Sequence, residues 1–160
     1  MRTRDLEGEA GEPTWTAAEE RYAYDRAVLL ERCPPPCDLV DLCAAPGVQS
    51  IALARAGYRV TAVDLGEALD GWGDSADGST EAALVRAGVE PVLAGLDAPP
   101  LPLADGAFDV AVLTEVLEHL REYPLRTLAE VRRILRPCGL LVLTTPNASS
   151  LQKRPRRPAE

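Results

Sequence analysis

The sequence predicts an α/β fold: a doubly wound, Rossmann-like parallel sheet of about five strands with helices on both faces. Two observations lead to this prediction. Five short apolar segments alternate with helical segments along the chain, and these apolar segments lack the polar alternation of half-exposed strands. The chain has 160 residues, of which 46% are hydrophobic, so it can form one domain with a substantial core.

The two ends of the chain differ in composition from its centre. Residues 1–13 are acidic and contain glycine, and we expect them to be disordered. Residues 14–32 have the apolar periodicity of a helix, which the three prolines that follow must end, so 14–36 forms an N-terminal helical segment. We expect the folded domain to extend over 14–147, followed by a basic, flexible tail at 148–160.

The alternating elements follow the first helix. Strands are predicted at 38–42, 58–64, 89–95, 109–115 and 140–145, and helices at 48–56, 80–87 and 124–136. Gly57 and Gly88 directly follow two of these helices, where glycine is the usual residue. A polar loop is predicted at 70–79, and the Pro-Cys-Gly run at 137–139 is expected to end the helix at 124–136.

Charge and cysteine content exclude several functions. The formal net charge is −8, and an acidic body repels a phosphate backbone, so we expect no binding to nucleic acid. No apolar run approaches the ~20 residues that cross a bilayer, and the N-terminus lacks an apolar leader, so we expect a cytoplasmic protein without a membrane segment. Cys33 and Cys37 form a CPPPC pair without the further ligands that zinc needs, so we expect no metal and read them as small, reduced, buried thiols.

Candidate ligand-binding residues follow from the topology, because doubly wound sheets bind ligands beyond the carboxyl ends of their strands. The positions are Asp41–Gly47 after the first strand, Asp64 at the end of the second, Asp97 after the third, and Glu115–His119 after the fourth. Asp64 ends an otherwise apolar strand, and its carboxylate can accept hydrogen bonds from both hydroxyls of a ribose. The alternative for Asp64 is a helix N-cap.

The loop after the first strand reads CAAPG, which does not match the GxGxxG fingerprint of NAD-binding domains. Cys43 and Ala45 carry β-carbons, and these block the close approach of a pyrophosphate. A cofactor without a pyrophosphate demands less of this loop. Both residues fit a working loop if their backbones keep a negative φ. An NAD-type domain is therefore the least supported interpretation.

Two stretches of this sequence resemble class I S-adenosylmethionine-dependent methyltransferases of the small-molecule type. They are DLVDLCAAPGVQSIALARAGYRVTAVDL and FDVAVLTEVLEHLREYPLRTLAEVRRILRPCGLLVLTTPN, and the resemblance covers about residues 37–147. The first resembles the family's Asp/Glu-x-Gly-x-Gly-x-Gly loop, with Cys43 and Ala45 at the first two glycines and Gly47 at the third. The second stretch is the more specific of the two.

The resemblance implies S-adenosylmethionine as the cofactor and assigns roles to individual residues. Asp64 would hold the ribose, while Asp97 would meet the adenine amino group, with Leu96 beside the ring. Glu115 and His119 would be the catalytic residues, with His119 as a base if the acceptor is a hydroxyl; a packed histidine is the alternative. The implied cofactor-binding residues are Asp41, Cys43, Ala45, Gly47, Asp64, Leu65, Leu96, Asp97, Thr114 and Glu115.

Three absences narrow the methyl acceptor. RNA cytosine-5 methyltransferases share DLCAAPG but use a Pro-Cys pair after the fourth strand, where this chain has TEVLEH. Ribose 2′-O-methyltransferases rely on lysines, and the only lysine is Lys153 in the tail. The N/D-P-P-Y/W run of DNA amino-methyltransferases does not occur after the fourth strand. We therefore expect transfer to an oxygen, nitrogen or carbon of a small molecule or a protein, by in-line displacement.

The family's sheet normally continues with a helix and an antiparallel hairpin after the fifth strand. Only 15 residues follow Thr145, so we expect that hairpin to be lacking and strand 140–145 to lie near an open edge. An open edge favours pairing with a second copy or a partner. The alternative function is that of a non-catalytic or truncated S-adenosylmethionine-binding protein that acts as a partner subunit.

Overall fold

The computed structural model describes most of the chain, in the ranges 14–66, 80–120 and 124–146. Three predictions lie outside these ranges and stay predictions: the disordered N-terminus at 1–13, the polar loop at 70–79 and the flexible tail at 148–160.

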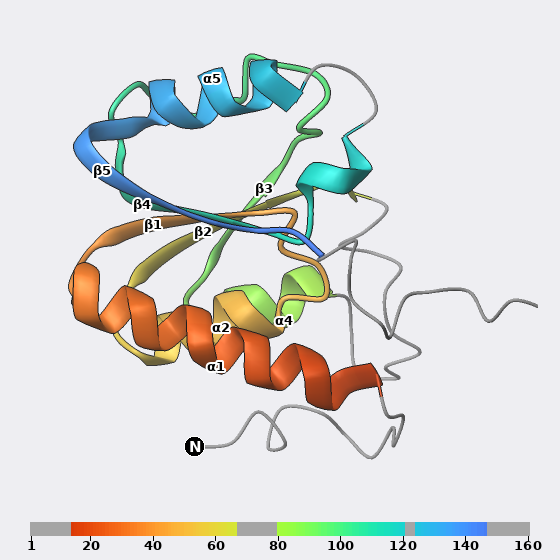
Figure 1. Cartoon of the computed structure of the whole chain (residues 1–160), viewed down its shortest axis with the longest axis vertical. Helices are drawn as coiled ribbons and strands as arrows, with labels where there is room; N and C mark the ends of the chain where they lie inside the picture. Colours follow the sequence, from red (N-terminus) through yellow and green to blue (C-terminus); the bar gives the residue numbers. More distant parts are fainter. Residues whose placement is uncertain (1–13, 67–79, 121–123, 147–160) are drawn as a thin grey trace, which may run out of the picture.

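Helices and strands alternate along the described chain (Figure 1). The helices are α1 (Thr14–Arg32), α2 (Val48–Arg55), α4 (Thr80–Arg86) and α5 (Pro124–Ile134), with a short 3₁₀ turn, η2 (Leu117–His119). The strands are β1 (Asp38–Leu42), β2 (Arg59–Asp64), β3 (Glu90–Leu93), β4 (Phe108–Thr114) and β5 (Leu135–Thr144). They form one parallel sheet in the order β3-β2-β1-β4-β5, which confirms the predicted doubly wound, five-stranded fold.

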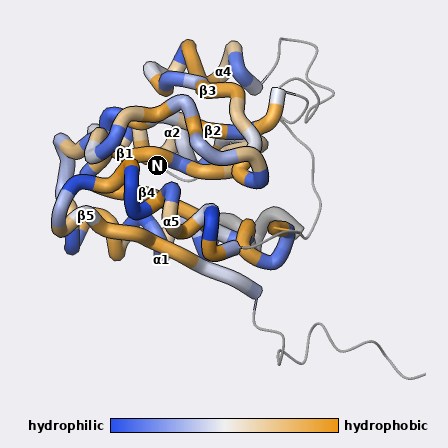
Figure 2. The backbone as a smooth tube through the Cα atoms, turned by 90° about the horizontal axis from the view of Figure 1, so that it is seen from above, coloured by the Kyte–Doolittle hydropathy of each residue, from blue (hydrophilic) through white to orange (hydrophobic). Residues whose placement is uncertain are grey.

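Successive residues of the central strands face opposite sides of the sheet, and each side has its own core. Leu39 of β1 packs on the side that α1, α2 and α4 cover, together with Leu53 of α2 and Leu84 of α4. Val40, the next residue of β1, packs on the opposite side with Ile134 of α5. Burying a side chain of this size stabilises a fold by about 1.5–3 kcal/mol. The central strands are therefore apolar on both faces, and most residues of β1 and β4 are buried. Orange, hydrophobic stretches of the tube lie around the β1 and β2 labels in Figure 2.

The last strand begins earlier than the sequence predicts. Helix α5 ends at Ile134 rather than at residue 136, and β5 starts at Leu135 rather than at residue 140. The Pro-Cys-Gly run lies within the strand, where the ladder with β4 shifts register and Cys138 has a φ of 66°. A β-carbon on Gly139 would lie 2.9 Å from the backbone oxygen of Arg136, so glycine is required there. The helix therefore ends before the run is reached, and the run forms a β-bulge-like irregularity within β5.

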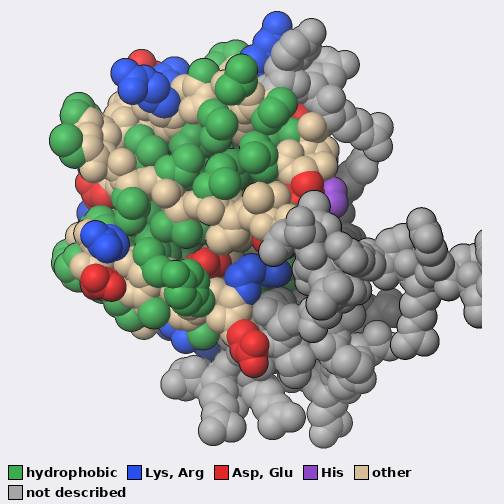
Figure 3. All heavy atoms as spheres, viewed as in Figure 1, with side chains coloured by type: hydrophobic (Ala, Val, Ile, Leu, Met, Phe, Trp, Pro, Cys, Tyr) green, Lys and Arg blue, Asp and Glu red, His purple; other side chains and the backbone are tan. Residues whose placement is uncertain are grey.

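Strand β5 lies at one edge of the sheet, next to β4 alone among the described strands. This position agrees with the predicted open edge. Hydrophobic side chains gather on the face of the molecule around α5 and β5 (Figure 3), where Leu125 and Leu143 are exposed. No helix in the described ranges is long and apolar enough to cross a membrane.

Candidate functional site

A cavity of about 440 Å³ lies at the carboxyl ends of β1, β2 and β4, where the strand order reverses direction. This is the switch point at which doubly wound sheets bind ligands. Seven of the predicted site residues line it: Asp41, Cys43, Ala45, Asp64, Thr114, Glu115 and His119. Three further polar residues in its wall were not predicted from the sequence: Arg21, Tyr22 and Gln49.

Asp64 organises the loop that follows β1. One carboxylate oxygen accepts a hydrogen bond from the backbone N–H of Ala45 at 2.8 Å, and the other accepts one from Leu65 at 2.7 Å. The backbone N–H of Cys43 also reaches β2, donating to the carbonyl of Val63 at 2.8 Å. Each carboxylate oxygen has more than one acceptor direction, so Asp64 can hold the loop and still accept hydrogen bonds from a ligand.

Cys43 differs from the prediction that both substituted loop residues keep a negative φ. Its φ is 61°, in the left-handed region, whereas Ala45 keeps a negative φ as predicted. A residue with a β-carbon in the left-handed region carries a cost of about 1–2 kcal/mol relative to glycine. Glycine is therefore the residue that the backbone at position 43 favours, and cysteine is tolerated there.

We expect Cys43→Gly and Ala45→Gly to differ in their effect on the free energy of unfolding. At position 43, glycine removes the left-handed strain, which offsets the lost packing of the thiol and the greater freedom of the unfolded chain, so we expect a change below about 1 kcal/mol. At position 45 no strain is relieved, so we expect a loss of about 1 kcal/mol. Urea unfolding of the two variants measures the difference. A larger loss for Cys43→Gly than for Ala45→Gly would contradict the account of the strained loop.

Asp41 lies beneath the same loop and is almost fully buried. Burial raises the pKa of this carboxyl to about 7, against the opposing effect of the Ser50 hydroxyl, which donates a hydrogen bond to it at 2.5 Å. The negative charges of Asp64 and Asp25 raise it further. The site therefore holds a carboxyl group that is part protonated near neutral pH in the ligand-free protein.

In the described ranges, three buried side-chain atoms have no hydrogen-bond partner within the protein, and two of them belong to residues that line the cavity. The three atoms are Nε of Arg21, Oδ2 of Asp25 and Nε2 of Gln49. Gln49 is only 6% exposed, and its amide oxygen already accepts a hydrogen bond from the hydroxyl of Thr114 at 3.2 Å. Its amide N–H groups are thus left for another acceptor. Because buried polar groups are nearly always paired, the unpaired atoms of Arg21 and Gln49, which line the cavity, are suited to a polar ligand there.

Glu115 follows β4 and has a φ of 57°, a strained conformation that is often found at functional sites. Its carboxylate lies 3.6 Å from the guanidinium of Arg21 and accepts a hydrogen bond from Thr144 at 3.3 Å. His119, in η2, is at the rim: its side chain is 78% exposed, with Nε2 4.0 Å from the carboxylate of Glu118. The two predicted catalytic residues therefore share the cavity, one within it and one at its opening.

Four predicted cofactor-binding residues do not line the cavity. Gly47 is buried between helices, where an added β-carbon would meet Leu84 of α4 at 3.1 Å, and its φ is 86°. Leu65 is exposed, and Leu96 belongs to the core on the α5 side of the sheet. Asp97 is exposed. Burial raises the pKa of the Cys43 thiol to about 12, and the negative charges of Asp64, Asp41 and Asp97 contribute to this rise.

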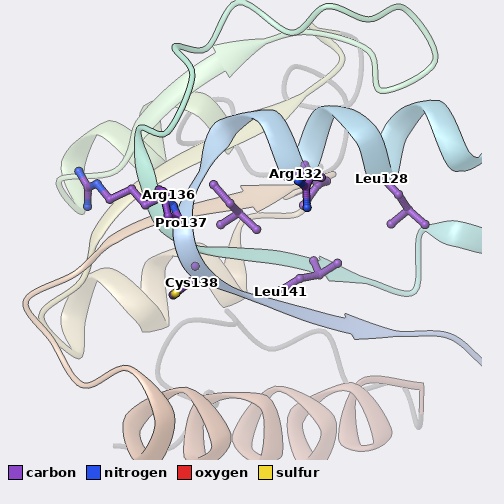
Figure 4. Close-up of a pocket in the computed structure, with 9 residues that line it drawn as sticks. Leu128, Arg132, Arg136, Pro137, Cys138 and Leu141 are labelled. Carbon is purple, nitrogen blue, oxygen red and sulfur yellow. The ribbon is translucent and has the colours of Figure 1, made fainter.

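A second, larger cavity of about 620 Å³ lies between α5 and β5 (Figure 4). Its wall is formed by apolar side chains such as Leu128 and Leu141, together with Arg132, Arg136 and Cys138. No carboxylate or histidine lines it. Although it is larger, this groove lacks the convergent polar groups of the switch-point cavity, so we place the functional site at the switch point.

The fold and this cavity together define a Rossmann-like domain that holds its ligand at the switch point of the sheet. Comparison with protein families is more specific: residues 15–159 match the model of the family described as "Methyltransferase domain". The chain belongs to this methyltransferase family.

Relatives and solved structures agree with the family. A malonyl-[acyl-carrier protein] O-methyltransferase of Serratia marcescens is 31% identical over 144 residues, which cover 90% of this chain and 52% of the relative. The chain thus spans about half the length of this relative. A methyltransferase structure from Aquifex aeolicus superimposes with a TM-score of 0.65 at 20% identity, covering 82% of this chain and 68% of the other.

A further structure carries a ligand. The 1,6-didemethyltoxoflavin-N1-methyltransferase of Burkholderia thailandensis, solved with 1,6-didemethyltoxoflavin and S-adenosylhomocysteine bound, superimposes with a TM-score of 0.63. It is 24% identical, and the match covers 82% of this chain and 54% of that structure. At this level of identity the match establishes a shared fold.

Proposed function

We propose that this chain binds S-adenosylmethionine in the switch-point cavity and positions it for methyl transfer to a small molecule or to a group on a protein. The observation that carries the proposal is the set of polar groups that meet there. Three carboxyl groups, those of Asp41, Asp64 and Glu115, share the cavity wall with one guanidinium, that of Arg21, and the buried amide nitrogen of Gln49 lacks a partner. An acidic cavity with a free amide donor suits a ligand that carries positive charge, hydroxyls and one carboxylate.

The residues of the cavity fit the parts of this cofactor. Asp64 would accept hydrogen bonds from the ribose hydroxyls. Arg21 and the amide of Gln49 would hold the carboxylate, while Asp41, close to the loop, would face the ammonium group. The contacts of Leu96 and Asp97 with the adenine stay predictions, because neither residue is in the cavity wall.

For methyl transfer the protein mainly has to align the acceptor with the methyl group, and it does not have to activate that group. The cofactor supplies a methyl group that is already activated, so the main tasks of the chain are to orient the acceptor in line with it and to exclude water. For a hydroxyl acceptor, a base at the opening of the cavity would remove the proton, and His119 or Glu115 can serve. Glu115 is already paired with Arg21, which leaves His119 as the more available base.

The test separates three functions. Thermal unfolding of the folded chain is measured with S-adenosylhomocysteine, with NAD⁺ and without ligand. Stabilisation by S-adenosylhomocysteine alone supports the proposal, whereas stabilisation by NAD⁺ alone would overturn it. Transfer of a deuterated methyl group to pools of small molecules and to malonyl-carrier-protein, followed by mass spectrometry, then distinguishes an enzyme from a non-catalytic partner subunit.

Gln49→Leu provides a test with two separate readouts. Leucine cannot donate to the cofactor's carboxylate, so we expect the affinity for S-adenosylhomocysteine to fall about tenfold, as for one hydrogen bond to a charged group. Without ligand the substitution removes an unpartnered buried amide nitrogen, which offsets the loss of the acceptor for the Thr114 hydroxyl, so the free energy of unfolding should stay within about 1 kcal/mol of the original. Calorimetric titration and urea unfolding measure the two. Unchanged affinity would contradict the assigned role of Gln49.

His119→Gln tests the base. With a hydroxyl acceptor, we expect turnover to fall by about 10² or more, because glutamine keeps a polar side chain at the rim but cannot take a proton. Affinity for S-adenosylhomocysteine should not change, since His119 is largely exposed. Turnover equal to that of the original chain would exclude His119 as the base.

The edge of β5 supports a second, coarser proposal. An apolar surface beside an unpaired strand is suited to pairing with a strand of a second copy or of a partner. This pairing stays a prediction, and it does not depend on the proposed binding of the cofactor.

A further inference from the structure

The segment CPPPC, residues 33–37, joins α1 to β1 and brings two thiols together. The sulfur atoms of Cys33 and Cys37 are 2.8 Å apart. A disulfide bond is about 2.05 Å long, so the two atoms need to approach by less than about 1 Å to bond. Each of the three intervening prolines has its φ fixed by its ring, so little freedom is lost in holding the two ends of the segment close together.

Hydrogen bonds to neighbouring elements hold both cysteines. The N–H of Cys33 donates to the carbonyl of Leu29 in the last turn of α1, and the Tyr58 hydroxyl donates to the carbonyl of Cys33 at 2.9 Å. The carbonyl of Cys37 accepts a hydrogen bond from the N–H of Arg59, at the start of β2. The two thiols therefore face each other as part of the folded structure.

A small reagent can reach this pair. Both cysteines are half-buried and line a cavity of about 360 Å³, whose wall also contains the exposed Cys138. No group of three or more histidine, cysteine or acidic residues in the described ranges is placed to hold a metal ion. The geometry thus suits a two-thiol reaction better than metal binding.

We propose that Cys33 and Cys37 form a dithiol site that small diffusible disulfides oxidise to an intramolecular disulfide. The site is distinct from the cofactor cavity. Arg21, which is in the wall of that cavity, precedes Cys33 by 12 residues, or roughly 18 Å along a helix. The proposal is therefore independent of the methyl-transfer function.

The reaction proceeds by two thiol–disulfide exchanges. The thiolate of Cys37 attacks one sulfur of the reagent RSSR, whose S–S bond breaks and releases one RSH, leaving Cys37 bonded to SR. The thiolate of Cys33 then attacks the sulfur of Cys37, and the second RSH leaves. Two protein thiols are oxidised by two electrons, one RSSR is reduced to two RSH, and the two thiol protons end on the products.

Cys33 is assigned the second step because it is the poorer first nucleophile. Burial, the hydrogen bond with Cys37 and the nearby charges of Cys37 and Asp109 raise the pKa of the Cys33 thiol to about 11. Once Cys37 is bonded to SR, its contribution to that rise is removed.

Peptide mapping of the full chain tests the proposal. The reduced chain is incubated with oxidised glutathione, quenched in acid, alkylated and digested with trypsin. The peptide that starts at Cys33 also contains Cys43, so fragment ions must locate the bond. We expect a bond between Cys33 and Cys37 and free Cys43. Both Cys33 and Cys37 remaining alkylatable while Cys138 carries glutathione, or a bond between Cys37 and Cys138, would overturn the proposal.

Serine variants and a second reagent complete the test. Cys33→Ser and Cys37→Ser should each stop at a glutathione adduct on the remaining thiol of the pair, while Cys138→Ser, in the same cavity wall, should form the disulfide as the original chain does. Phenylarsine oxide, whose arsenic bonds two adjacent thiols with loss of water, should bind the original chain and Cys138→Ser but neither of the other variants. Binding that persists in Cys33→Ser would also overturn the proposal.

Discussion

Asp64→Ala is expected to lower the affinity for S-adenosylhomocysteine by at least about 100-fold. The variant loses the carboxylate that would bind the ribose hydroxyls, and hydrogen bonds to a charged group contribute about 1.5–3 kcal/mol each. It also loses the acceptor for the backbone N–H of Ala45, which closes the loop over the cavity. Calorimetric titration measures the affinity, at a temperature where circular dichroism shows that the variant is folded.

Two further variants make the result specific to Asp64. Asp64→Asn keeps one acceptor oxygen without the charge, so its affinity should lie between those of the original chain and the alanine variant. Asp105→Ala removes an exposed acid that pairs with Arg133, away from the cavity, so its affinity should not change. Unchanged affinity in Asp64→Ala would refute the ribose assignment.

Asp41→Asn is expected to stabilise the ligand-free chain at pH 8. Burial raises the pKa of Asp41 from 3.8 to about 7, so the folded state disfavours the ionised carboxylate. The contribution of protonated Asp41 to the free energy of unfolding is fully present below about pH 4 and is lost as the pH rises towards 7. With 1.36 kcal/mol for each pKa unit, this loss amounts to at most about 4 kcal/mol. Asparagine cannot ionise and still offers an oxygen to the Ser50 hydroxyl.

The measurement is the free energy of unfolding in urea at pH 5 and pH 8 for both chains. The free energy of unfolding of the asparagine variant, relative to that of the original chain, should rise by a few kcal/mol from pH 5 to pH 8, because the Asp41 carboxyl of the original folded chain ionises within this range. Ser50→Ala removes the hydrogen bond but keeps the buried carboxyl, and it should retain the pH dependence. A difference between the two free energies of unfolding that stays constant with pH would contradict the raised pKa of Asp41.

The strand ends could be predicted from the sequence because their signals are local. An acidic residue at the end of an apolar strand, such as Asp64, lies at the carboxyl edge of the parallel sheet however the helices pack against it. Asp41, Thr114 and Glu115 lie in the cavity wall for the same reason. The order and direction of the strands then bring these residues together, which the alternation of strands and helices already implies.

The residues that the sequence analysis missed are on helices. Arg21 and Tyr22 belong to α1, and Gln49 is the second residue of α2. Their contact with the cavity depends on how each helix is rotated against the sheet, which the sequence specifies only through packing. For Gln49 a signal existed, since a polar residue in the first turn after the loop is next to the ligand site. Leu96 and Asp97 are the converse case: they were predicted from the sequence but do not line the cavity, and their contacts with the adenine stay predictions.

The early start of β5 was missed because proline and glycine usually interrupt regular structure. Here Pro137 and Gly139 lie in an edge strand, where a proline without an N–H is tolerated and a bulge accommodates the glycine. The sequence could not indicate that residues 135–139 also belong to this edge strand.

The central claim is that the switch-point cavity binds S-adenosylmethionine, and the most direct measurement is calorimetric titration of the 160-residue chain with S-adenosylhomocysteine at two protein concentrations. We predict one site per chain with micromolar affinity, equal at both concentrations. The absence of binding by a chain that circular dichroism shows to be folded would contradict the account.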